Sequence, residues 1–309
     1  MKTNPIDNIL PRTTDNNLKV ILNDYVDLIQ EIVNFGTHIL NWDIQQNSAE
    51  KDNNIPSISF RNIIELADSI SILFKSSSID PSKIILRSII ENSYGLIYMI
   101  ENNDNIRGKQ FMIWKANKDI KYLNQFITTE RSYKRFKSKL KKDSIDFNFA
   151  NYFDNPEILQ SKKTKEKLLE KSDFRDIQSE YIKTSKIIKN PNWYALFDGP
   201  RNFEELSIYL NKTLTYEFSY RNYSKNVHSE GMIKGFTYCG NGKAQVIQIR
   251  DFEDSHNVFV GTITILLELY NEFIRKRLPD NLQEFQDWFK DFREPFHNLR
   301  KNKPFRYEK

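Results

Sequence analysis

Residues Asn17 to Trp42 read NLKVILNDYVDLIQEIVNFGTHILNW, and this stretch decides the fold class. Its apolar side chains recur every three or four residues, as they do on one face of an amphipathic helix. They are Leu18, Ile21, Leu22, Tyr25, Val26, Leu28, Ile29, Ile32, Val33, Ile39 and Leu40. The spacing predicts a long helix with one continuous buried face.

The same period returns along the rest of the chain. Asp80 and Pro81 suit a helix start, because aspartate can cap free N–H groups and proline loses no hydrogen bond in the first turn. Asn202 and Glu205 have the spacing of a capping box, which predicts a short helix there. We predict further helices over residues 59–75, 80–101, 106–127, 157–171, 173–188, 254–276 and 282–293, and one that carries Leu214, Phe218, Arg221 and His228. The predicted class is an all-α multi-helix bundle.

The amino-acid composition favours the same class. Nine glycines and ten prolines make up about 6% of the chain, against about 12% in average proteins, and a many-stranded fold would use more of both at its turns. Four glycines gather in residues 229–250, at Gly231, Gly235, Gly240 and Gly242. We expect a loop there, with a short strand at residues 245–249 or one short hairpin, that serves as a lid or substrate-contacting segment.

Charge and composition also narrow the function classes. An excess of 46 Lys+Arg over 41 Asp+Glu gives a net charge of +5, which permits an anionic partner without requiring one. The single cysteine, Cys239, excludes an internal disulfide, and the four histidines are too far apart in sequence for a metal motif. The chain has no glycine-rich phosphate motif, no secretory signal and no stretch of 18 apolar residues. We expect a soluble, cytoplasmic protein with no metal, no cofactor and no membrane contact.

We divide the chain into a flexible N-terminus (residues 1–15), the first helices of the bundle (16–130), a basic helical insertion (131–192), the C-terminal helices (193–295) and a basic tail (296–309). The insertion opens with a run of cations without an acidic residue. Such a run can be a solvated helix face, or it can follow a phosphate backbone while Tyr133 and Phe136 stack on bases. The candidates for nucleic-acid contact are Lys134, Arg135, Lys137, Lys139, Lys141 and Lys142.

The segment YRNYSKNVH, from Tyr220 to His228, places an arginine and a histidine seven positions apart. Seven residues bring His228 to within about 20° of Arg221 around a helix, and Ser224 lies one turn from each. Such a pair can cleave a phosphodiester bond, because histidine moves a proton near neutral pH and the guanidinium fork stabilises a phosphate.

A second pair, Arg250 and His256, has a similar spacing at the start of the predicted 254–276 helix, and we rank it second. Both spacings also arise by chance in a chain of this composition. An ordinary arginine and histidine on a helix surface is therefore the simpler interpretation of either pair.

The residues around the first pair resemble a bacterial domain family of unknown function. The resemblance rests on Trp193, Tyr216 and the pattern Tyr220-Arg221-x-x-Ser224-x-x-x-His228 followed by Ser229, and it spans about residues 60–275. That family is similar to outlying members of the HEPN (higher eukaryotes and prokaryotes nucleotide-binding) helical group. Its N-terminal Arg-x-x-x-Glu is matched by Arg87 and Glu91. By default these two form an ion pair within one helix, and the resemblance adds a role in supporting the Arg/His groove.

The resemblance implies a HEPN-like bundle in which Arg221 and His228 cut RNA without a metal, commonly in a site formed across a homodimer. Tyr220, Asn222 and Ser224 would support the pair or bind substrate. Many such proteins are toxins or phage-defence effectors, which implies a regulatory or antitoxin partner. The six residues between Arg221 and His228 are the long end of the HEPN range, and many catalytic members have four.

Three functions therefore remain. The leading hypothesis is a metal-independent endoribonuclease. The second is a non-catalytic helical module that binds a nucleotide, a nucleic acid or a protein through Tyr220, Arg221 and His228. The third is a structural dimer with the Arg/His stripe buried at a twofold interface.

Overall fold

The computed structural model describes residues 3–11, 16–47, 54–102, 104–142, 153–227, 235–238, 244–250 and 252–301. The chain forms two compact units, the first made of Met1–Asp104 and Ser207–Lys309 and the second of Asn105–Leu206. Apart from one two-stranded hairpin, the regular structure in these residues is helical, which confirms the predicted all-α class.

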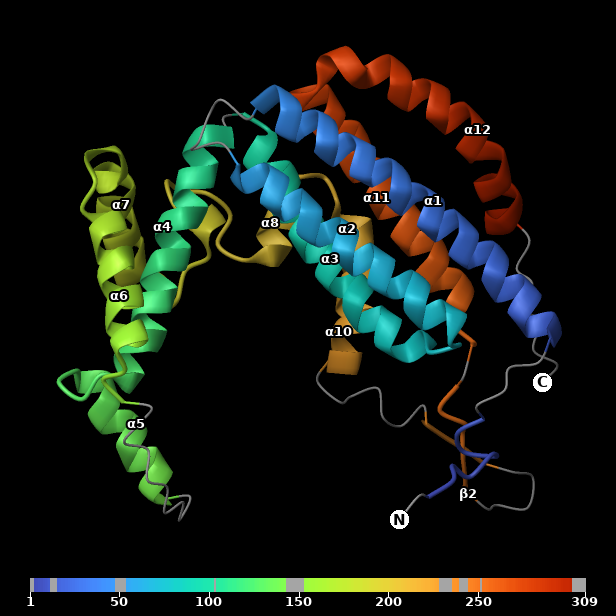
Figure 1. Cartoon of the computed structure of the whole chain (residues 1–309), viewed down its shortest axis with the longest axis horizontal. Helices are drawn as coiled ribbons and strands as arrows, with labels where there is room; N and C mark the ends of the chain where they lie inside the picture. Colours follow the sequence, from blue (N-terminus) through green and yellow to red (C-terminus); the bar gives the residue numbers. More distant parts are fainter. Residues whose placement is uncertain are drawn as a thin grey trace. The chain divides into compact units, whose positions relative to one another are not determined.

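A ring of four helices forms the core of the first unit. Each helix packs against the next, and the last returns to the first (Figure 1). The four, in order around the ring, are α1 (Asn16–Asn47), α2 (Ile55–Lys75), α3 (Ile79–Ile100) and α11 (Ser255–Arg277). α11 is long and apolar enough to span a membrane, but 56% of its most apolar window is buried inside the protein, as in the core helix of a soluble protein.

Aromatic rings fill the centre of this ring of helices. Tyr25 stacks on Phe259 with ring centroids 4.3 Å apart, and the Tyr270 hydroxyl donates a 2.9 Å hydrogen bond to the Ile32 carbonyl. A Cβ at Gly36 would overlap that hydroxyl. The glycine in α1 is therefore what allows α11 to approach so closely.

The ends of several helices differ from the prediction. α2 begins four residues early because Pro56 lies in its first turn, where proline loses no hydrogen bond. α3 begins after Ser78, so the predicted capping role of Asp80 is wrong; this carboxylate lies in the first turn and pairs with Lys83.

α12 (Leu282–Lys301) packs against α1 and α11 and contains Pro295 (Figure 1). We predicted that this helix would end near residue 293, and that prediction is wrong. Phe292 and Phe296 are buried on either side of the proline, and the Phe296 ring meets Phe259 at 5.9 Å. Burial of two phenyl rings outweighs the cost of one proline inside a helix.

The part of the chain that precedes α11 is more irregular than predicted. α8 (Phe203–Tyr209) has the predicted cap, since the Glu205 N–H donates to Asn202 Oδ1 at 2.9 Å. α9 (Thr213–Thr215) continues into a π-helical turn (Tyr216–Tyr220) and then α10 (Arg221–Val227), where we had predicted one uniform helix. β1 (Phe236–Tyr238) pairs antiparallel with β2 (Ala244–Val246), so the region 229–250 contains a short hairpin.

The second unit contains α4 (Asp104–Leu123), α5 (Arg131–Lys142), α6 (Pro156–Leu169) and α7 (Arg175–Ile187). α4 is held to α6 by an ion pair between Asp119 and Lys165 at 3.1 Å, and to α7 by a hydrogen bond from Asn117 to Gln178 at 2.7 Å. The apolar core of this unit is formed by Ile113, Phe174, Ile177 and Leu196.

Candidate functional site

Arg87 joins α3 to α10. Its Nε donates to Ser224 Oγ at 2.8 Å, and a terminal guanidinium nitrogen donates to the Tyr220 hydroxyl at 2.8 Å. The Arg87 side chain is only 22% exposed, and hydrogen bonds from a charged donor strengthen as water is excluded. Because Tyr220 and Ser224 lie one turn apart, a single guanidinium fixes the rotation of α10 about its own axis.

Glu91 lies beside this contact. Its carboxylate is 3.8 Å from the Arg87 guanidinium and accepts a long, 3.5 Å hydrogen bond from the Tyr220 hydroxyl. The Arg87–Glu91 ion pair within α3 is thus present, but the shorter bonds of Arg87 cross to α10. Burial, followed by the charge of Glu91, raises the pKa of Tyr220, so this phenol stays protonated at neutral pH.

The π-helical turn before α10 helps to decide which residues face α3. Within it the rings of Tyr216 and Tyr220 stack at 5.4 Å. A π turn contains more residues than an α-helical turn, so it changes the direction of every side chain that follows. Tyr220 and Ser224 turn toward α3, and Arg221 turns toward solvent.

Arg221, the predicted catalytic arginine, is 60% exposed and forms an ion pair with Glu217 at 2.9 Å. Asn222 is also exposed. His228 lies outside the described residues, so its pairing with Arg221 stays a prediction. Of the predicted site residues, the contact of α3 with α10 brings together Tyr220, Ser224, Arg87 and Glu91.

A buried lysine that we did not predict lies one turn before Arg87. The Lys83 side chain is 6% exposed and pairs with Asp80 and with Asp254, at the start of α11. Burial opposes its charge, but hydrogen bonds to Asp254 and Asp80 outweigh burial and raise the pKa of Lys83. Burial also raises the pKa of the neighbouring Tyr223 to about 12. A lysine among the isoleucines of a core helix was the only signal in the sequence.

His256, from the second predicted pair, lies in the first turn of α11. Its Nδ1 is 3.0 Å from the hydroxyl of Tyr25 on α1, and the two rings are in contact. At Arg250, the backbone carbonyl accepts a hydrogen bond from the Gln248 side chain. Within the described part of the chain, no three or more His, Cys, Asp or Glu side chains are placed to hold a metal.

A pocket of about 400 Å³ lies between the π-helical turn, α10 and the start of α11. It brings together two of the predicted residues, Asn222 and His256, that are far apart in the sequence. Three further residues give the pocket its chemistry, and none was predicted: Phe218, Asn257 and Arg300.

In the second unit, α5 has no buried residue. All six candidate cations for nucleic-acid contact are exposed, and none forms an ion pair with another described residue. Tyr133 and Phe136 are only partly exposed, because their rings pack against Phe153 at 4.9 Å and Phe126 at 5.7 Å. The lysines and arginine of α5 therefore form a basic surface supported by an aromatic row.

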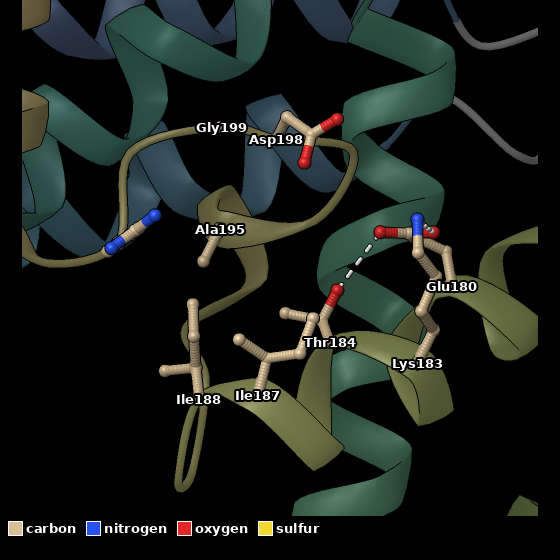
Figure 2. A pocket seen from close by; sticks show the side chains of 9 residues that line it. Glu180, Lys183, Thr184, Ile187, Ile188, Ala195, Asp198 and Gly199 are labelled. Carbon is tan, nitrogen blue, oxygen red and sulfur yellow. Dashed lines mark hydrogen bonds and ion pairs between the residues drawn. The ribbon is translucent and has the colours of Figure 1, made fainter.

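A second pocket, of about 160 Å³, lies in the second unit beside α7. Figure 2 shows Thr184 directed at Glu180, to which it donates at 3.0 Å. The Phe197 N–H also donates to this carboxylate, at 3.4 Å, from a backbone in which Phe197 and Asp198 both have positive φ. Partial burial opposes ionisation of Glu180, but bonds from Thr184 and Lys183 lower its pKa. The carboxylate thus holds a strained loop in place.

The comparisons with known proteins agree with part of the resemblance. Among curated proteins and among solved structures, nothing matches this chain. The sequence model of a family of unknown function, DUF5677, matches residues 53–243, which is more than half of the chain and includes α2, α3 and α10. The protein therefore belongs to this family of unknown function, DUF5677.

Proposed function

We propose that this protein is a metal-independent endoribonuclease of the HEPN type, with Arg221 and His228 as its catalytic pair. The observation that carries the proposal is the contact of Arg87 with both Tyr220 and Ser224. This contact joins two of the sequence features on which the family resemblance rests, the Arg-x-x-x-Glu of α3 and the Tyr-Arg-x-x-Ser that leads into α10. Arg87 and Glu91 then act as positioning residues for the helix that carries Arg221.

Arg221 is available to a phosphate. Its ion pair with Glu217 joins two exposed side chains one helical turn apart, and such pairs hold by only about 0.3–0.5 kcal/mol. A phosphate offers two oxygens that match the guanidinium fork. An RNA phosphate can therefore replace Glu217 at little cost.

The reaction needs two proton transfers and charge stabilisation. The 2′-hydroxyl of RNA attacks the neighbouring phosphorus as a base removes its proton, and the bond to the 5′-oxygen breaks as that oxygen takes up a proton. The products are a 2′,3′-cyclic phosphate and a 5′-hydroxyl. His228 is suited to proton transfer near neutral pH and Arg221 to the charge on the phosphate oxygens. We propose a homodimer, in which the second copy of the motif supplies the other proton-transfer group.

A second candidate is a non-catalytic RNA-binding module. It is favoured by the basic surface of α5, whose six exposed cations suit a phosphate backbone with or without cleavage. The two candidates differ in one result, because the module binds RNA and leaves it intact.

The test uses a labelled single-stranded RNA and the same sequence made of 2′-deoxynucleotides, each incubated with the protein in EDTA. We expect cleavage of the RNA to 2′,3′-cyclic phosphate ends and no cleavage of the deoxy strand, because the attacking group is the 2′-hydroxyl. The His228→Ala protein, purified in the same way, controls for contaminating nucleases. Cleavage of the deoxy strand would contradict the proposed chemistry, and salt-sensitive binding without cleavage would favour the second candidate.

A further inference from the structure

We infer that the pocket between the π-helical turn, α10 and α11 binds one nucleotide of a single strand, with its base inside. We call it the base pocket and define it by Phe218, Asn222, His256, Asn257 and Arg300. The inference rests on the proposed function only for the identity of the polymer, RNA.

The size of the base pocket suits a nucleotide. Its volume of about 400 Å³ lies within the range of roughly 300–1,000 Å³ typical of small-molecule sites, which often lie between helices. One wall is held in place, because Nδ1 of His256 is 3.0 Å from the Tyr25 hydroxyl and the two rings are in contact.

Phe218 is the stacking surface of the base pocket. Its side chain is 76% exposed, and its ring contacts no other aromatic ring among the described residues, whereas Phe35, Phe60 and Phe259 all do. Every base has a π face, so bases stack on an exposed ring whatever their sequence. An unstacked base is the ligand that such a ring accepts most readily.

Two amides can contact the edge of that base. Asn222 comes from α10 and Asn257 from α11, and neither side chain has a hydrogen-bond partner in the described structure. An amide presents a donor and an acceptor side by side, which matches the N6 and N7 positions of adenine. A sugar or a phosphate alone would leave Phe218 unused.

Arg300 supplies the contact for the phosphate. It is exposed near the end of α12 and forms no ion pair with any described residue. Its guanidinium fork fits a phosphate group. The pocket therefore combines a stacking ring, edge-reading amides and a phosphate contact, as recognition of a nucleotide requires.

The position of the base pocket gives it a role in specificity. Phe218 and Asn222 lie one turn apart, on either side of Arg221 in the sequence. The same short segment thus presents Arg221 to a phosphate and Asn222 to a base. We infer that the base pocket selects the nucleotide next to the bond that is cut.

The test is calorimetric titration of the full chain with AMP, ribose 5-phosphate and inorganic phosphate. We expect AMP to bind at least about tenfold more tightly than ribose 5-phosphate, and Phe218→Ala to weaken AMP binding about tenfold without changing ribose 5-phosphate binding. Arg300→Ala should weaken the binding of both AMP and ribose 5-phosphate. The matched control is Phe197→Ala, which replaces an exposed phenylalanine of the second unit (49% exposed). It should change the binding of neither AMP nor ribose 5-phosphate.

Equal binding of AMP and ribose 5-phosphate, or unchanged AMP binding by Phe218→Ala, would overturn the inference. Circular dichroism of Phe218→Ala confirms that any loss is not unfolding, and Asn222→Ala gives an independent variant. The result is separate from the nuclease test. AMP binding with these mutant effects supports the base pocket even if the wild type leaves RNA intact in EDTA. RNA cleavage with no base preference refutes the base pocket and leaves the proposed nuclease activity standing.

Discussion

Arg87 Nε on α3 lies 2.8 Å from Ser224 Oγ on α10, and the two residues are 137 positions apart in the chain. The same guanidinium reaches Tyr220 one turn earlier. The orientation of α10, and with it the exposure of Arg221, therefore depends on one side chain of the helical core.

Replacing Arg87 tests this dependence. Arg87→Ala should lower the free energy of unfolding by about 1–3 kcal/mol, because Ser224 and Tyr220 both lose a charged donor. Arg87→Lys should lose less stability than Arg87→Ala, since lysine keeps the positive charge but not the guanidinium fork. Urea titrations measure both. Arg61→Ala is the control, since the exposed Arg61–Glu65 pair is worth no more than about 1 kcal/mol; an equal loss in the control would contradict the prediction.

Glu217 competes with RNA for Arg221. Glu217→Gln should therefore raise affinity for single-stranded RNA about twofold, because it removes the carboxylate of an exposed ion pair. Fluorescence anisotropy at low salt measures the change, with Glu65→Gln as the matched control. A fall in affinity would show instead that Glu217 orients Arg221 for binding.

The basic surface of α5 should determine the salt dependence of RNA binding. Replacing Lys134, Lys137 and Lys141 together by alanine should make the negative slope of log affinity against log salt shallower by about 2. Each contact with a single strand contributes about 0.7 to the size of this slope. Removing Lys163, Lys167 and Lys171 takes away the same charge at and just after α6, beside acidic residues, and is the control. Equal slopes in the two triple variants would show that α5 is not part of the RNA-binding surface.

Tyr223 gives the stability a dependence on alkaline pH. Its pKa is about 12 in the folded chain and about 10 when unfolded, so the folded state favours the neutral phenol. This contribution is complete below pH 10 and is lost as the pH rises toward 12. In urea titrations from pH 8 to 11, Tyr223→Phe should lose less stability above pH 10 than the wild type. Parallel curves for the two proteins would contradict the assignment.

Local periodicity was sufficient to predict most helices, because a helix that buries one face must repeat its apolar residues. The predicted helix from Asn17 to Trp42 lies within α1, and the Asn202–Glu205 cap is present. The end of α12 could not be predicted in this way. Pro295 favours a helix end locally, and only the packing of Phe296 against Phe259 in α11 explains why the helix continues.

The sequence predicted less of the candidate site than of the helices. The spacing of the motif placed Ser224 on one stripe with Arg221 and His228, and the resemblance gave Arg87 a supporting role. Neither indicated that Arg87 would bind both Ser224 and Tyr220 while Arg221 faces solvent. The π-helical turn has no sequence signature that we recognised, and it changes the direction in which Arg221 points. Phe218 was read as one apolar residue of a helix, and Arg300 as part of a basic tail, because only the fold brings them beside Asn222.

The catalytic role of Arg221 and His228 is tested most directly by the rate of RNA cleavage in EDTA by the wild type and three single variants. We expect His228→Ala and Arg221→Ala each to lower the rate by about 100-fold or more, whereas Arg61→Ala, from an exposed pair of the same kind, should cleave like the wild type. Cleavage by His228→Ala at the wild-type rate would contradict this catalytic role.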